Sequence, residues 1–123
     1  MKEKIQIAEH ELIIANDISE LLEENDYEVT EICSTYEEGI ACFQKECPDL
    51  IISELILNRP HHYDGIKIIE SIRKTSNMPI IYLTGYPKIK EAIATNPFAF
   101  LTKPINGQDL LDVIRLALNS NKT

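Results

Sequence analysis

Strand-like and helix-like segments alternate along this chain, and no other feature limits its possible folds as strongly. Runs rich in β-branched and other apolar residues are each followed by a segment whose apolar residues recur at helical spacing. Five such pairs within 123 residues predict a doubly wound parallel sheet with helices on both faces. The expected strands are 4–8, 27–33, 50–53, 79–83 and 98–101.

Local signals indicate where several of these elements begin and end. Ser34-Thr35 followed by Glu37-Glu38 is typical of a capping box, and Asn106 with Asp109 predicts the cap of the last helix. A short fourth helix is expected within 87–95, and residues 118–123 are expected to form a flexible tail. The chain is therefore interpreted as a single domain over residues 1–123.

The composition of the chain argues against several classes of function. Hydrophobic residues make up 44% and charged residues 26%, as in an ordinary globular domain, and the net charge of −8 argues against direct nucleic-acid binding or a polybasic membrane patch. No apolar run reaches the roughly 20 residues of a membrane span, and the start does not resemble a signal peptide. We therefore expect a cytoplasmic protein. Three cysteines without a CxxC pair predict no disulfide framework and no zinc site.

Polar residues follow the expected strands at the edge where such sheets place their sites. They are Glu9-His10-Glu11, Glu54, Thr84 and Lys103. The four glycines form neither GxGxxG nor GxxxxGK[ST], so a nucleotide cofactor is not expected. A carboxylate cluster with one ammonium and one hydroxyl instead suits phosphoryl chemistry on a carboxylate with a divalent cation.

Five segments, taken in order, resemble the receiver domain of two-component response regulators, the CheY-like family. These segments are 5–11, 48–54, 63–65, 79–86 and 100–104. The resemblance covers nearly the whole chain. It implies a flavodoxin-like sheet of strand order 2-1-3-4-5 with five flanking helices, and a role in phosphorelay signal transduction.

The same resemblance suggests a role for each strand-end residue. Glu54 stands at the phosphoacceptor position, and Glu9, His10 and Glu11 stand at the acidic pocket that holds Mg²⁺ in the family. The switch pair corresponds to Thr84 and Phe100, and the family's lysine and the proline after it, a candidate cis peptide bond, correspond to Lys103 and Pro104.

Glu54 departs from the family pattern, which has aspartate at this position. The additional methylene moves the carboxylate outward by about 1.5 Å, and a misplacement of ~1 Å can slow an in-line transfer by ~10²-fold. One interpretation is that Glu54 makes the site unable to accept a phosphoryl group. A second is that Glu54 imitates the phosphorylated state by approaching Thr84 and Lys103, and a third is that it is a solvated residue at a relic site.

His10 is the second departure, since Mg²⁺ prefers oxygen ligands to imidazole. We therefore expect no cofactor. Mg²⁺ is expected to bind only if the site still functions as it does in the family. We hypothesise that a protonated His10 pairs with Glu54 or Glu9; the alternative is a partly exposed histidine with ordinary titration. His61 and His62 are adjacent in a loop and do not share a face, so no metal site is expected there.

These observations predict an atypical receiver domain that is not an enzyme and acts through protein–protein contacts without phosphorylation. Expected partners are a histidine kinase, an output domain or a second copy bound through the fourth helix, fifth strand and fifth helix. Tyr82, Tyr86 and Ile89 are expected near that face, with ordinary packing in the core and at its rim as the alternative. A buried Phe100 would favour a locked domain. One alternative is a working receiver that accepts a phosphoryl group with Mg²⁺; another is a metal-dependent enzyme using Glu54 and His10.

Overall fold

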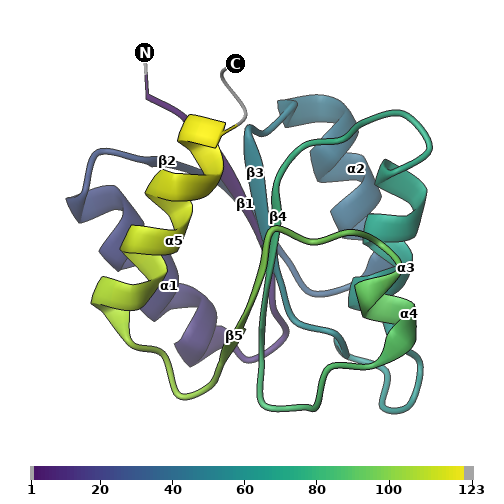
Figure 1. The fold of residues 1–123 in the computed structure, drawn as a ribbon. Coiled ribbons are helices and arrows are strands. Elements are labelled where there is room, and N and C mark those ends of the chain that lie inside the picture. Colours follow the sequence, from purple (N-terminus) through teal and green to yellow (C-terminus); the bar gives the residue numbers. More distant parts are fainter. Residues whose placement is uncertain (1, 121–123) are drawn as a thin grey trace.

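The computed structural model describes residues 2–120 as one parallel sheet with a helix after each strand (Figure 1). The strand order is β2-β1-β3-β4-β5, which confirms the predicted doubly wound fold. None of the helices within residues 2–120 is long and apolar enough to cross a membrane. The strands are β1 (Lys4–Ala8), β2 (Glu28–Cys33), β3 (Leu50–Ser53), β4 (Ile80–Thr84) and β5 (Ala99–Thr102), and the helices are α1 (Leu12–Glu24), α2 (Tyr36–Glu46), α3 (Asp64–Ile72), α4 (Lys90–Ile93) and α5 (Gly107–Ser120).

The sheet separates two apolar cores (Figure 1). Helices α1 and α5 cover one face, and α2, α3 and α4 cover the other. Successive side chains of a strand point to opposite faces, so Leu50 and Ile52 of β3 pack toward α1 and α5 while Ile51 packs toward α3. All four residues of β3 are buried, as the uninterrupted apolar run predicts for a central strand.

Both predicted helix caps are present. The Thr35 hydroxyl oxygen accepts a hydrogen bond from the Glu38 backbone N–H at 3.1 Å, and the Glu38 carboxylate accepts one from the Ser34 N–H at 2.8 Å. At α5, the Asn106 side-chain oxygen accepts from the Asp109 N–H at 3.0 Å. These bonds satisfy N–H groups that have no partner within the first turn of a helix.

Several boundaries differ from the expectations. Strands β4 and β5 each begin and end one residue later than predicted, β2 begins one residue later, and α4 is confined to Lys90–Ile93. Helix α5 continues to Ser120, so residues 118–120 do not form the expected tail. Leu118 is 6% exposed and follows Ile114 by four residues, which keeps it on the buried face of the helix. The rest of the expected tail, 121–123, lies outside the described residues.

Candidate functional site

The structure brings four of the predicted polar residues together at the carboxyl ends of neighbouring strands. Glu9 follows β1, Glu54 follows β3, Thr84 ends β4 and Lys103 follows β5. Backbone hydrogen bonds tie these ends together, from Glu54 N–H to the Ala8 carbonyl and from Lys103 N–H to the Thr84 carbonyl, both at 3.0 Å. Glu9, Glu54 and Thr84 are each at most 3% exposed, so their polar atoms need partners within the protein.

Lys103 supplies the cation at the centre of the site. Its Nζ lies 2.6 Å from Glu9 Oε1 and 3.0 Å from Glu54 Oε1, and 3.9 Å from the more exposed Glu11. Burial lowers the pKa of Lys103, but hydrogen bonds and charge from Glu9 and Glu54 outweigh it, so the pKa is raised overall. The ammonium therefore stays charged at neutral pH and joins the two buried carboxylates.

Backbone N–H groups hold the remaining carboxylate oxygens. Glu54 Oε2 accepts a hydrogen bond from the Leu55 N–H at 2.6 Å. Glu9 Oε2 accepts one from the Glu11 N–H at 3.0 Å. Each of the four oxygens of Glu9 and Glu54 thus has a donor within the protein, and both carboxylates are fixed in orientation.

His10 lies at the edge of this cluster. Its Nδ1 is 3.6 Å from Glu9 Oε2, and 37% of its side chain is exposed. Of the two hypothesised pairings, the structure therefore has the one with Glu9, whereas Glu54 contacts Lys103 instead. The protonation of His10 stays a prediction. His61 and His62 lie away from these carboxylates, where they line a cavity of about 250 Å³ with Lys67 and Glu91.

The two residues at the switch positions are held by different neighbours. Thr84 Oγ1 accepts a hydrogen bond from the Tyr86 N–H at 3.0 Å, and no hydrogen bond joins it to Glu54 within residues 2–120. Phe100 is half-buried and its ring stacks on Tyr82. Tyr82 is fully buried, so it cannot belong to an exposed docking face as we had expected. Its place in an apolar strand does not reveal which face of the sheet it occupies.

An ion pair between Arg59 and Asp64 was not predicted. Arg59 donates two hydrogen bonds of 2.7 Å to the carboxylate of Asp64, which is 1% exposed at the start of α3. Hydrogen bonds from Arg59 hold the pKa of Asp64 below its ordinary value, with a further contribution from Lys67 at 3.7 Å. The spacing of five residues across a turn-rich loop is the only sequence signal for this contact.

The loop that follows Glu54 approaches the backbone of Glu54 closely. Gly65 N–H donates to the Leu55 carbonyl at 3.0 Å, and a Cβ at Gly65 would overlap the Glu54 carbonyl oxygen. A glycine is therefore required for packing at this point. On the other side of the site, the Lys103–Pro104 peptide bond is cis.

Comparisons with known proteins show the family to which this chain is similar. The family model described as the response regulator receiver domain matches residues 5–115. Transcriptional regulatory protein PdtaR of Mycobacterium tuberculosis is 29% identical over 119 residues, which cover 94% of this chain and 57% of PdtaR. The chain spans about half the length of the curated relatives it matches.

Solved structures show the same similarity. A response regulator receiver domain protein from Clostridium thermocellum is 32% identical, with a TM-score of 0.84 and coverage of 98% of this chain and 97% of the other. A CheY-like receiver domain protein from Methanospirillum hungatei is 27% identical, with a TM-score of 0.87 and coverage of 98% and 96%.

The fold, the strand-end site and the comparisons together define a signalling domain of the CheY-like class. The chain belongs to the response regulator receiver domain family and is a receiver domain of two-component signalling. Receiver domains of this family act by contact with kinases and output domains.

Proposed function

We propose that this receiver domain signals through protein–protein contacts without being phosphorylated. The observation that carries the proposal is the Lys103 bridge, which occupies one oxygen of Glu54 and one of Glu9. Because the Leu55 N–H also holds the other oxygen of Glu54 at 2.6 Å, the carboxylate is fixed in orientation and cannot turn freely into the in-line geometry that attack on a phosphoryl donor needs. The longer side chain of Glu54 thus reaches a cation already present in the protein.

The donor set at these positions does not fit Mg²⁺. This ion requires near-octahedral oxygen ligands at 2.0–2.1 Å, whereas the buried carboxylates Glu9 and Glu54 already share Lys103. His10 contributes a nitrogen where a further carboxylate would serve the ion. We therefore assign no step to a metal, and in this proposal the ammonium of Lys103 provides the positive charge.

The interpretation of Glu54 as a mimic of the phosphorylated residue receives partial support. Glu54 contacts Lys103 at 3.0 Å, whereas the hydroxyl of Thr84 accepts its hydrogen bond from Tyr86. Glu54 therefore reaches one of the two residues that the mimic requires. We infer a site held in one state, with a fixed arrangement at β4 and β5.

The contact surface in this proposal is the face formed by α4, β5 and α5. Exposed side chains on or beside these elements include Tyr86, Ile93, Phe98 and Leu116, each at least 42% exposed. Exposed apolar side chains of this size suit a protein partner better than a small ligand. The partner in this proposal is a second copy of the domain, an output domain or a kinase.

A phosphorylation assay with a matched gain-of-function variant tests the proposal. The purified chain and the double variant His10→Asp, Glu54→Asp are incubated with acetyl phosphate and Mg²⁺, and the intact mass is measured. We expect no phosphoryl adduct on the wild-type chain and an adduct on the double variant, because shortening residue 54 withdraws it from Lys103 and residue 10 becomes an oxygen ligand.

A phosphoryl adduct on wild-type Glu54 would overturn the proposal in favour of a working receiver. Beryllofluoride with Mg²⁺ provides a second measurement, by NMR shifts at Thr84 and Lys103. We expect the wild-type shifts to stay unchanged. The metal-dependent enzyme has less support, because no cluster of three metal-ligating side chains occurs within residues 2–120.

A further inference from the structure

The ring of Phe100 on β5 contacts the buried side chain of Tyr82. The ring centroids of Phe100 and Tyr82 are 5.3 Å apart, and the planes are inclined by 26°, a stacked arrangement. Tyr82 is fully buried, and its hydroxyl lies 2.8 Å from Thr95 Oγ1. Thr95 in turn donates to the Ala92 carbonyl of α4 at 2.6 Å. The position of Phe100 is thereby linked to α4.

A cation contacts the same ring from the solvent side. Lys88 Nζ lies 5.3 Å from the centroid of Phe100, within the range of a cation–π interaction. Lys88 is exposed, and no ion pair involves it within residues 2–120. Phe100 thus contacts both a buried aromatic side chain and an exposed ammonium.

Lys88 belongs to the loop that connects Thr84 to α4, so its contact also restrains that loop. The same loop is held by the hydrogen bond from Tyr86 N–H to Thr84 Oγ1. Beyond Lys88, the partly buried side chain of Ile89 packs against the core next to the start of α4. The segment before α4 is therefore attached at three successive points.

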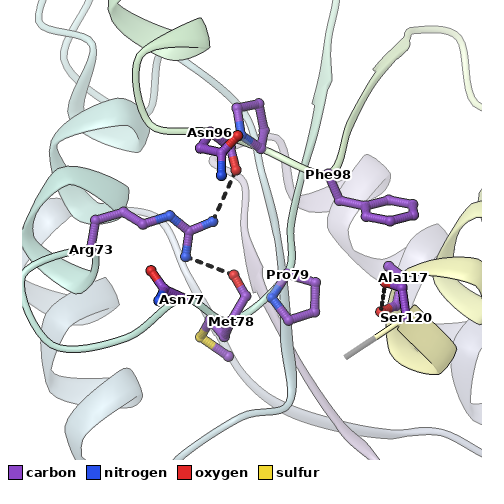
Figure 2. A pocket seen from close by; sticks show the side chains of 9 residues that line it. Arg73, Asn77, Met78, Pro79, Asn96, Phe98, Ala117 and Ser120 are labelled. Carbon is purple, nitrogen blue, oxygen red and sulfur yellow. Dashed lines mark hydrogen bonds between the residues drawn. The ribbon is translucent and has the colours of Figure 1, made fainter. Parts of the chain in front are cut away.

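Arg73 fixes the other end of α4 (Figure 2). Its Nε donates to the Thr95 carbonyl at 2.8 Å. Figure 2 shows two further bonds, from Nη2 to the Asn96 carbonyl at 3.3 Å and from Nη1 to the Met78 carbonyl at 2.7 Å. Arg73 lines a cavity of about 290 Å³ at the end of the sheet opposite Lys103. Because its guanidinium already binds these carbonyls, we assign it a structural role.

We propose that Lys88 and Tyr82 clamp the Phe100 ring and thereby keep the face formed by α4 and β5 in one conformation. This inference deepens the proposed function, on which it rests, by naming the contact that keeps that face fixed. Tyr82 prevents inward movement of the ring, since its hydroxyl is bonded to Thr95. Lys88 opposes outward movement of the ring, since a displaced ring loses its cation–π contact with the Lys88 ammonium.

Three variants of the full chain test the clamp in the absence of any phosphoryl donor. Lys88→Met keeps most of the aliphatic stem and removes the charge, whereas Lys88→Arg keeps the charge. Lys90→Met removes one positive charge from the same segment without contact to the ring. Phe100 is labelled with ¹³C in its ring, and NMR reports the ring environment and its contacts with Tyr82.

We expect Lys88→Met to increase the population of displaced Phe100 by about two- to fivefold, the range of an exposed cation–π contact. Lys88→Arg and Lys90→Met should resemble the wild type. Equal spectra for Lys88→Met and Lys90→Met would overturn the clamp. This outcome is independent of the mass measurement on Glu54, so failure of the clamp and failure of the proposed function are distinguishable.

Discussion

Lys103 lies 3.0 Å from Glu54 and 2.6 Å from Glu9, so that one ammonium bridges carboxylates from two neighbouring strand ends. The side chain of Lys103 is only 14% exposed and both glutamates are buried. Removing one of these side chains should therefore destabilise the fold, because it leaves a buried charge without its partner. The cation between the two carboxylates is thus a side chain of the protein itself.

Replacing Lys103 with methionine should destabilise the domain by about 3 kcal/mol, because it leaves two buried carboxylates without their cation. Urea unfolding measures this loss, with Lys90→Met as the control for an exposed lysine of α4. Adding Glu54→Gln to Lys103→Met should restore part of the stability by removing one unpaired charge. A loss equal to that of the control would contradict the bridge.

Alkaline pH should remove the contribution of Lys103. Its pKa is higher in the folded chain than the ordinary value of 10.5, so its stabilisation is complete below that value and is lost as pH rises through the folded pKa. The measurement is the difference in unfolding free energy between wild type and Lys103→Met across this range. We expect the difference to be constant at neutral pH and to fall at higher pH. A constant difference at every pH would argue against this pairing.

Asp64→Asn should cost about 1–3 kcal/mol, because an uncharged amide with one acceptor oxygen replaces the carboxylate that accepts two hydrogen bonds from Arg59. The pKa of Asp64 is below its ordinary value of 3.8, so its contribution is present above that value and is lost as pH falls through the folded pKa. The free energies of unfolding of the wild type and of the variant should therefore become more similar in acid. Asp17→Asn on the exposed side of α1 is the control and should show no such convergence.

Gly65→Ala should destabilise the domain by about 3 kcal/mol or more, since a Cβ there overlaps the backbone oxygen of Glu54. Gly85→Ala is the matched control because no atom lies within 4 Å of its added Cβ. The control should change the free energy of unfolding by less than about 0.5 kcal/mol. Similar melting temperatures for the two variants would show that the loop does not approach Glu54 as described.

Tyr82→Phe should reduce stability by about 1–2 kcal/mol, because the buried Thr95 hydroxyl loses a hydrogen-bond partner at 2.8 Å. Tyr86→Phe is the control, with the same chemical change on a side chain that is 50% exposed. Thermal unfolding of both variants measures the difference. If Tyr86→Phe were as destabilising as Tyr82→Phe, the hydrogen bond to Thr95 would not explain the loss.

Features that depend on neighbouring residues were predictable from the sequence. The apolar run 50–53 identified the central strand, and the pair Thr35 and Glu38 identified a helix start, because both signals act within a few residues. Leu118 was assigned to a tail although its spacing from Ile114 places it on the buried face of α5. In that case the helical period was a better guide than proximity to the chain end.

Contacts between distant segments were not predictable in the same way. Tyr82 was expected at a surface, but a fully apolar strand carries no alternation that tells its two faces apart. The contact between Phe100 and Lys88 joins a strand to a loop twelve residues earlier, and no periodic signal marks such a pair.

Local patterns alone therefore established the parallel sheet, its helices and the edge at which the polar residues gather, since β–α alternation and strand ends follow from backbone geometry. The folded chain was needed to show that Lys103 joins Glu9 to Glu54 and that His10 lies beside Glu9. Such partner choices depend on small differences in the separation of side chains that follow different strands. Those separations are set by the packing of the whole domain.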